Sequence, residues 1–527
     1  MNTEVPIIGL NFREPEPISK SIRDDSGLMM SNSQNRILLF CILVVAAFLQ
    51  IYRIGAPPLW LDEALSYSRS QMPVAEIIKA AYHWDVHPAT YYVLLHFWKT
   101  LGNSEAILRM LSVIFSFFSL PVLFSFCGKI RNRQFALAAT FFLSVSLLHV
   151  RYAQEVRSYA LYFLISLFVY FHFYLALQSG KPKHWYFWAA ASILNLYIHY
   201  FALFLFVTQL IWLVLSLLIS GESRKRIHWK AALPAVVLIG IAFIPQLLFF
   251  VKQAGTKVST DSEIWRAANP LQFGLIYLKT FVCPISLTSG ILDKGLKYAV
   301  LLILGIGNIL AWPRYRDDIL FHGFQFVAVG LLTWMASFFV VIPAPFKYVI
   351  FANISFVMLC TLSLLGILNR IEKISFLKRY SIVIYAFISL GFVLTITRLY
   401  WDYYQMPRAE DWMSGVETVQ SQYRESDQVV AIPDYSDYQF KYYAAKQNFQ
   451  APVTRMKQET LKELQDFLKN AERTFVLSIG STQEEMSRIN VFLKENGSLI
   501  WQDDHFPNTK IWLIQRRDLN SHPARAG

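Results

Sequence analysis

The chain has 527 residues, of which 55% are hydrophobic and only 16% are charged. This composition excludes an ordinary soluble protein, because stretches of about 20 apolar residues recur before residue 400 and match the hydrocarbon core of a bilayer. The formal net charge of +13 does not indicate nucleic-acid binding, since Lys and Arg gather in short loops between the apolar segments.

Residues 1–35 are polar and of mixed charge, and we expect a disordered cytoplasmic tail rather than a cleaved signal peptide. The sequence then predicts a transmembrane domain over residues 36–397 with about eleven spanning helices. The division within 185–219, at the His-Tyr-Phe stretch, is open, and a single long segment there would change the parity. The predicted spans are 36–54, 107–128, 134–149, 159–177, 185–199, 201–219, 231–251, 295–312, 320–342, 349–368 and 380–397.

Every second loop is short and basic, which predicts that these loops face the cytoplasm together with the N-terminus. They cover residues 129–133, 181–183, 222–230, 313–318 and 369–379. The remaining loops are then extracytoplasmic. They include a long first loop of residues 55–106, which is too long for a simple connector.

The composition changes after about residue 398. Short apolar runs predict strands, and amphipathic segments between them predict helices. This alternation predicts a small extracytoplasmic α/β domain over residues 398–527. The expected strands are 428–433, 474–480, 498–502 and 510–516, and the expected helices are 438–446, 459–470 and 483–495.

The outer loops hold acids and cations that are costly near a membrane and therefore indicate a site. A carboxylate can take a proton from an acceptor hydroxyl, and cations can stabilise the charge that grows on a departing phosphate. If that phosphate belongs to a lipid, the site must open to the bilayer. The candidate residues are Asp62, Glu63, Asp85, His87, Glu155, Arg157, Lys347 and Tyr348.

Five stretches in this order resemble the C-type integral-membrane glycosyltransferases, in the bacterial branch related to protein O-mannosyltransferases and the lipid A aminoarabinose transferase. They are "LDEALSY" from Leu61, "DVHPATYYVLLHFWKTLGNSEAILRMLSVIFS" from Asp85, "YAQEVRSYALYFL" from Tyr152, "PFKYVIF" from Pro345 and "RAEDWMSGVETV" from Arg408. The resemblance implies a membrane enzyme that takes a sugar from a polyprenyl-phosphate carrier. It implies transfer, usually with inversion, to an acceptor on the outer face of the membrane.

The resemblance also assigns roles. Asp62 matches the candidate general base and Glu63 its neighbour, and Glu155 falls where relatives often carry an acid. Arg157 matches the arginine expected near the lipid phosphate. Two positions depart from the pattern: Lys347, before Tyr348, stands where many relatives have Arg, and His87 where some have Lys. Lysine keeps the charge but loses the two-pronged grip of a guanidinium.

Each candidate also has a structural interpretation. Asp62 and Glu63 are suited to a helix N-terminus, and Arg157 and Lys347 to anchoring at the membrane interface. Glu155 can pair with a neighbouring arginine, and Asp85 and His87 can cap a loop. His149 and His199 lie on largely apolar segments, where we expect satisfied core histidines.

No metal is expected to be obligatory, although Asp62, Glu63 and Glu155 offer oxygen ligands suited to Mg²⁺ or Mn²⁺. The expected function is an inverting glycosyltransferase of the cell (inner) membrane, acting on a polyprenyl-phosphate sugar and a protein, lipid or glycan acceptor. The main alternative is a transporter or flippase of lipid-linked sugars, which predicts polar groups at mid-membrane and paired halves. A non-catalytic scaffold would leave the acids and arginines unexplained.

Overall fold

A computed structural model describes residues 31–83, 85, 87–219, 227–254, 269–282, 291–338, 347–406, 412–457, 461–479, 483–506 and 509–516. The predicted tail up to residue 30 lies outside these residues. The chain forms two compact units, each described separately. The first is Met1–Ile54, Val74–Leu94 and Arg109–Gln405, and the second is Gly55–Pro73, Leu95–Leu108 and Met406–Gly527.

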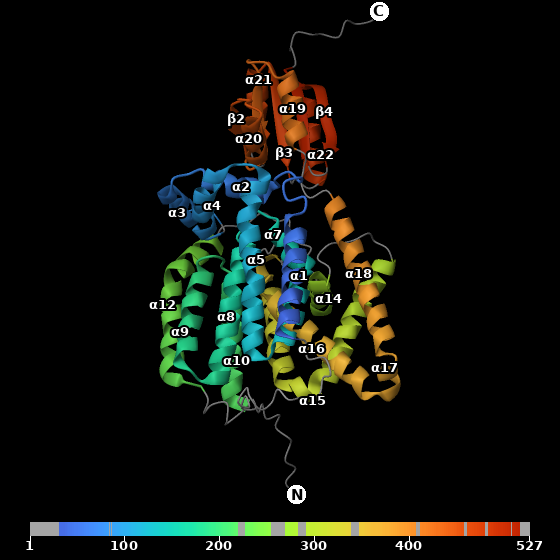
Figure 1. Cartoon of the computed structure of the whole chain (residues 1–527). Helices are drawn as coiled ribbons and strands as arrows, with labels where there is room; N and C mark the ends of the chain where they lie inside the picture. The colour runs from blue at the N-terminus through green and yellow to red at the C-terminus, as the bar shows by residue number, and fades with distance from the viewer. Residues whose placement is uncertain are drawn as a thin grey trace, which may run out of the picture. The chain divides into compact units, whose positions relative to one another are not determined.

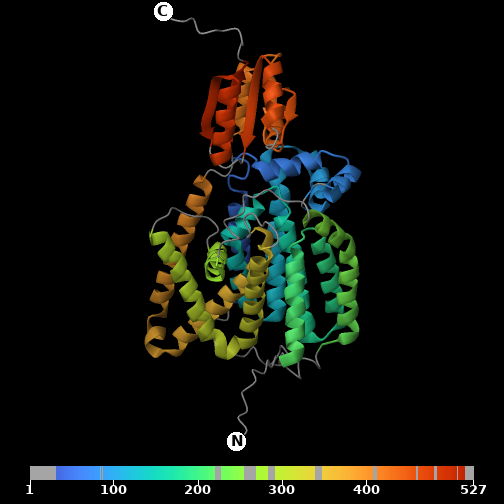
Figure 2. The same cartoon turned by 180° about the vertical axis from the view of Figure 1, so that it is seen from behind.

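The first unit is a bundle of long apolar helices (Figure 1). Within it α8 packs on α9, α9 on α12, and α15 along α16 (Figures 1 and 2). Its elements are α1 (Asn32–Ile51), α3 (Val74–His83), α4 (Thr90–Trp98), α5 (Glu105–Ile130), α6 (Arg133–Ser144), α7 (Leu147–Ala153), α8 (Tyr159–Ser179), α9 (Pro182–Leu196), α10 (Ala202–Ile219), α12 (Trp229–Ala254), α14 (Pro270–Val282), α15 (Ile291–Ala336), η2 (Lys347–Val349), α16 (Ala352–Lys373), α17 (Ser375–Arg379) and α18 (Ser381–Gln405), with α4 and α5 continuing into the second unit.

Local sequence signals set the ends of these helices. Ser31 caps α1, because its hydroxyl accepts a hydrogen bond from the Gln34 backbone N–H while the Gln34 side chain accepts from the Ser31 N–H. Asn132 caps α6 in the same way through the Phe135 N–H. Gly180, with φ of 62°, ends α8 in the left-handed conformation, and Pro182 begins α9.

Each of the eleven predicted spans overlaps a helix, and residues 339–342 of one span lie outside the described residues. The described residues hold seven helices long and apolar enough to cross a membrane, or eight if the bent pair α6–α7 is one span. The difference has two causes. Helix α15 covers two predicted spans and is broken at Tyr315, whose backbone angles are non-helical. Helix α9 is short, and α10 passes only as a shorter apolar helix. The chain is a multi-span membrane protein, and the count of eleven stays a prediction.

Two glycines let α15 and α16 approach each other closely. A Cβ atom on Gly366 would lie 2.2 Å from the Gly307 carbonyl oxygen and 2.7 Å from the Ala311 backbone nitrogen. A Cβ on Gly307 would lie 2.7 Å from the Ser363 carbonyl oxygen. Because these neighbours are backbone atoms, a side chain at either glycine would push the two helices apart. Small residues at such crossings are typical of membrane helix packing.

We therefore expect Gly366→Ala to destabilise the protein by about 1–3 kcal/mol, the usual cost of overpacking. Gly305→Ala is the control, because Gly305 lies on the partner helix α15 and a Cβ there would meet no atom within 4 Å. Thermal unfolding of both variants in detergent measures the difference. Equal unfolding temperatures for the two variants would show that α15 and α16 are not in close contact.

The second unit contains a mixed five-stranded sheet of order β2-β1-β3-β5-β4 with helices packed on it (Figures 1 and 2). Strand β1 is parallel to β2 and β3, and β5 is antiparallel to β3 and β4. The predicted α/β class is correct. The elements are α2 (Leu61–Ser70), η1 (Lys99–Leu101), α19 (Trp412–Gln422), β1 (Gln428–Ala431), α20 (Asp437–Lys446), β2 (Val453–Arg455), α21 (Leu461–Asn470), β3 (Arg473–Ile479), α22 (Gln483–Asn496), β4 (Ser498–Phe506) and β5 (Thr509–Gln515).

Part of the long first loop packs within this second unit. The Tyr443 hydroxyl accepts a hydrogen bond from the Leu59 N–H at 2.8 Å, and the Tyr442 hydroxyl donates to the Asn103 carbonyl at 2.7 Å. Lys446 pairs with Glu105 at 2.7 Å. Helix α20 thereby holds the segment that leads into α2, so the paired acids sit on a fixed helix.

Candidate functional site

The paired acids lie in the first turn of α2, in the second unit. Glu63 is buried, and its carboxylate accepts the Trp60 backbone N–H at 3.3 Å, as a helix N-terminal acid does. Asp62 is partly exposed. The two neighbours thus differ, because Glu63 supports its own helix while Asp62 retains access to solvent.

The cationic candidates gather in the first unit, around one aromatic ring. Arg157 and Lys347 are both buried, and both lie near Tyr159: the guanidinium carbon is 6.0 Å from the ring centroid and the ammonium nitrogen 5.9 Å. Lys347 also lies 5.5 Å from the Tyr348 ring centroid. Two buried cations beside one aromatic ring form a cationic cluster, and such a cluster is suited to an anion.

His87 joins this cluster from the loop between α3 and α4. Its Nε2 accepts a hydrogen bond from Arg157, so the ring is neutral and carries its hydrogen on Nδ1. Burial, Arg157, His199 and Lys347 together lower the pKa of His87 well below its ordinary value of 6.5. The histidine therefore orients the arginine and adds no positive charge of its own.

This lowered pKa predicts a pH dependence. Below pH 6.5 the unfolded chain binds a proton at His87 that the folded chain does not. Each unit by which the pH is lowered in this range therefore reduces the free energy of unfolding by up to about 1.4 kcal/mol. His87→Gln keeps an acceptor for Arg157 but does not titrate. We expect any stability advantage of the unaltered protein over this variant at pH 7.5 to shrink at pH 5.5, measured by thermal unfolding. A pH-independent difference would contradict a neutral His87.

Asp85 positions this loop. Its Oδ1 accepts hydrogen bonds from the His87 backbone N–H at 3.0 Å and from the Tyr92 hydroxyl at 3.2 Å. The side chain is buried. These contacts agree with the interpretation of Asp85 as a loop cap. Asp85 thereby fixes the turn on which His87 lies.

Glu155 and Arg157 come from the short segment between α7 and α8. Arg151 Nε lies 3.9 Å from Glu155 Oε1, as the structural interpretation of Glu155 expects. The Arg157 N–H donates to the Glu155 carbonyl at 2.8 Å, and the Ser112 hydroxyl donates to the Arg157 carbonyl at 3.2 Å. These bonds hold the backbone that aims the guanidinium.

Gln154 fastens the same segment to the ends of α1 and α18. Its amide nitrogen donates to the carbonyls of Gln50, at 2.9 Å, and Tyr52, at 3.1 Å, and its oxygen accepts from the Tyr403 hydroxyl at 3.1 Å. Arg53 donates to the Tyr404 carbonyl at 3.1 Å. The segment that carries Arg157 is therefore held by two helices, α1 and α18.

Sequence reasoning missed three members of the cluster. Tyr159 and Tyr162 begin α8, and His199 lies in the turn between α9 and α10. The His199 ring is 5.5 Å from His87, 5.4 Å from Tyr348 and 5.8 Å from Tyr159. The expectation of a satisfied core histidine is correct for His149, which contacts the Ser116 hydroxyl at 2.9 Å, but it is wrong for His199.

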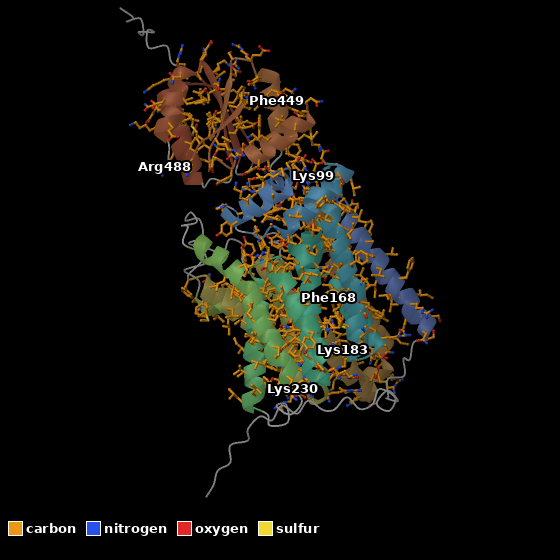
Figure 3. All side chains as sticks on the ribbon, turned by 90° about the vertical axis from the view of Figure 1, so that its left-hand side faces the viewer. Lys99, Phe168, Lys183, Lys230, Phe449 and Arg488 are labelled. Atoms are coloured by element: carbon orange, nitrogen blue, oxygen red, sulfur yellow. The ribbon has the colours of Figure 1, made fainter. Side chains whose placement is uncertain are left out.

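The cationic cluster lies at one end of the bundle. Arg157 precedes α8 and Lys183 follows it, and a helix of 21 residues is roughly 30 Å long, which is the thickness of a bilayer core. Lys183 and Lys230, from two of the basic loops, lie at the same end of the bundle, beyond Phe168 (Figure 3). The cluster of Arg157 and Lys347 and the basic residues Lys183 and Lys230 thus lie at opposite ends of the spanning helices.

Among the described residues, no group of three or more His, Cys, Asp or Glu side chains is arranged to hold a metal ion. Glu155 lies in the first unit, and Asp62 and Glu63 in the second. The suggestion of Mg²⁺ or Mn²⁺ bound by these three acids stays a prediction.

Comparisons with known proteins agree on the fold. Residues 85–249 match the family model described as dolichyl-phosphate-mannose-protein mannosyltransferase. This range includes His87, Arg157 and His199 but not Asp62 or Lys347. No curated protein matches the sequence.

Solved structures cover nearly the whole chain. The apo form of ArnT from Cupriavidus metallidurans matches with a TM-score of 0.57 at 10% identity, covering 91% of this chain and 97% of that one. ArnT bound to undecaprenyl phosphate gives 0.54 at 11% identity, with 92% and 98% covered. An Archaeoglobus fulgidus oligosaccharyltransferase tethered to an acceptor peptide gives 0.51 at 9% identity, with 91% and 74% covered. The predicted fold class, a polytopic helical membrane protein with a C-terminal α/β domain, is confirmed, and the chain shares its fold with ArnT and with this oligosaccharyltransferase.

Proposed function

We propose that the chain is a membrane-embedded inverting glycosyltransferase that moves a sugar from a polyprenyl-phosphate carrier to an acceptor hydroxyl. The observation that carries this proposal is the pair of buried cations, Arg157 and Lys347, against Tyr159 at one end of the spanning helices. Such a cluster suits a phosphate at the membrane surface. The family match and the fold shared with ArnT, which has been solved with undecaprenyl phosphate, support the same donor class.

In the proposed reaction Asp62 removes the proton from the acceptor hydroxyl. The acceptor oxygen attacks the anomeric carbon on the face opposite the phosphate, and the bond between that carbon and the phosphate oxygen breaks. Arg157 and Lys347 stabilise the negative charge that grows on the departing lipid phosphate. The proposal requires Asp62 to reach the acceptor while the donor phosphate rests on these two cations.

The other candidates position this machinery. His87 accepts a hydrogen bond from one N–H of Arg157 and so orients the plane of the Arg157 guanidinium. Asp85 fixes the turn that carries His87. Tyr348 contributes a ring beside Lys347. Glu63 stabilises the start of α2, and Glu155 pairs with Arg151.

We further propose that the protein lies in the cell (inner) membrane with its N-terminus in the cytoplasm and the cationic cluster on the outer side. The basic loops, which hold Lys183 and Lys230, support this orientation. The proposed organisation keeps a tail, now ending before the start of α1 at Asn32 rather than at residue 35, a catalytic membrane domain up to residue 397 and an outer domain over 398–527. In this scheme the outer domain helps to select the acceptor, be it protein, lipid or glycan.

One assay separates this function from a transporter or flippase of lipid-linked sugars. Purified protein in detergent, with no gradient, should consume a labelled polyprenyl-phosphate sugar and release polyprenyl phosphate when a cell-envelope extract supplies the acceptor. A transporter would leave the sugar on its carrier. Mass spectrometry of envelope glycans with and without the gene then identifies the sugar and acceptor. No turnover with any extract, together with unchanged glycans, would refute the proposal.

A further inference from the structure

The tautomer of His199 is fixed by its own turn. The Phe201 backbone N–H donates a hydrogen bond to His199 Nδ1 at 3.2 Å. Because Nδ1 accepts, a neutral His199 ring must carry its hydrogen on Nε2. The side chain therefore presents a hydrogen-bond donor at its outer nitrogen.

This donor is buried and has no acceptor among the described residues. His199 is only 2% exposed, and its Nε2 has no hydrogen-bond partner in the described part of the chain. Buried polar groups are nearly always paired, so one that is not indicates a bound molecule or a functional role. The Tyr162 hydroxyl is also buried and also has no hydrogen-bond partner among the described residues.

The surroundings indicate what would accept this hydrogen. The His199 ring stacks on Tyr162, with centroids 4.7 Å apart and planes 14° apart, and lies beside His87 and Tyr348. Arg157 and Lys347 are the charged groups that act on it electrostatically. A donor surrounded by two cations suits an anionic oxygen and disfavours a third cation.

We infer that His199 donates its Nε2 hydrogen to a phosphate oxygen of the lipid-linked donor, as a third ligand beside Arg157 and Lys347. This inference rests on the proposed function. A neutral donor adds a directional bond without adding charge, so it holds the phosphate in one rotation while the two cations neutralise it. His199 then sets the direction in which the anomeric carbon faces the acceptor.

Two variants isolate this hydrogen bond. His199→Asn keeps an oxygen near the Nδ1 position to accept the Phe201 N–H, but it lacks a donor at the Nε2 position. His199→Gln reaches that outer position with its amide N–H groups. We expect His199→Asn to weaken the binding of undecaprenyl phosphate about 10- to 100-fold, and His199→Gln to recover most of that loss. Binding is measured on purified protein in nanodiscs, with undecaprenol as the uncharged probe.

The outcomes are distinguishable. If the unaltered protein does not prefer undecaprenyl phosphate over undecaprenol, the proposed function fails. If it does, and His199→Asn binds as tightly, only the role of His199 fails, and the Nε2 hydrogen is satisfied by water.

A second measurement applies even if a variant does not fold. In unaltered protein carrying ¹⁵N-histidine, the ring N–H signal of a neutral histidine with its hydrogen on Nε2 should shift on adding undecaprenyl phosphate but not undecaprenol. The tautomer separates this signal from that of His87, whose hydrogen is on Nδ1. If no neutral-histidine signal responds to the phosphate, the inference is overturned.

Discussion

Asp62→Asn should lower the rate of sugar transfer by about 100- to 10,000-fold, the usual contribution of a general base. Asparagine has nearly the same shape but cannot take the acceptor's proton. Because Asp62 is partly exposed and lies in a helical first turn, the substitution should leave the fold intact. Initial rates with a labelled polyprenyl-phosphate sugar measure the effect, and binding of undecaprenyl phosphate should be unchanged.

Glu76→Gln provides the matched control for this experiment. Glu76 is also a carboxylate in the first turn of a helix of the same long loop, and it is exposed and paired only weakly with Lys79 at 3.9 Å. Its loss should leave the rate within about fivefold of the unaltered protein. Full activity in Asp62→Asn would remove this aspartate from the mechanism, whereas equal losses in both variants would indicate a general effect of the loop.

Arg157→Ala should lower the turnover number by about 100- to 1,000-fold, the range observed when one charge-stabilising donor is removed from a transition state. Arg157→Lys keeps the charge but loses the planar fork and the fixed bond to His87, so we expect an intermediate loss of about tenfold. The two variants therefore separate charge from geometry. Initial rates at saturating donor give the turnover number, and donor titrations show how much of the loss is in binding.

Arg151→Ala is the control on the same segment. Arg151 is 41% exposed and paired with Glu155, so its removal should cost no more than about fivefold in rate. A rate in Arg157→Ala equal to that of the unaltered protein would contradict a phosphate on this arginine. If Arg151→Ala lowers the rate as much as Arg157→Ala does, the effect comes from disturbing the segment between α7 and α8 and is not specific to Arg157.

Much of the fold could be predicted because long apolar segments have few alternatives in a membrane. Each of the eleven predicted segments overlaps a helix in the described part of the chain, and the strands β1, β3, β4 and β5 lie where short apolar runs indicated them. Strand β2 has only three residues, two of them exposed, and therefore carries no such pattern. The break at Tyr315 was predicted as a loop between two spans, but the structure keeps it as a kink within α15.

The site was harder to predict because its members depend on tertiary contacts. Residue type and resemblance singled out Arg157, His87 and Lys347, and the structure brings these three together around Tyr159. His199 was missed because its neighbours in sequence are apolar, and only the fold shows that its outer nitrogen lies buried among cations. Tyr159 could have been found from sequence, since it follows Arg157 by two residues.

The attachment of Gln154 to α1 and α18 has an evolutionary consequence. The chain leaves the first unit after Ile54, Leu94 and Gln405, and Gln154 bonds to Tyr52 and Tyr403, close to the first and the last of these exits. Insertions or exchanges beyond these two exits therefore leave the anchoring frame of the cationic cluster in place. Under the proposed function, related enzymes can therefore change the acceptor that they glycosylate while they keep the same lipid carrier as the sugar donor.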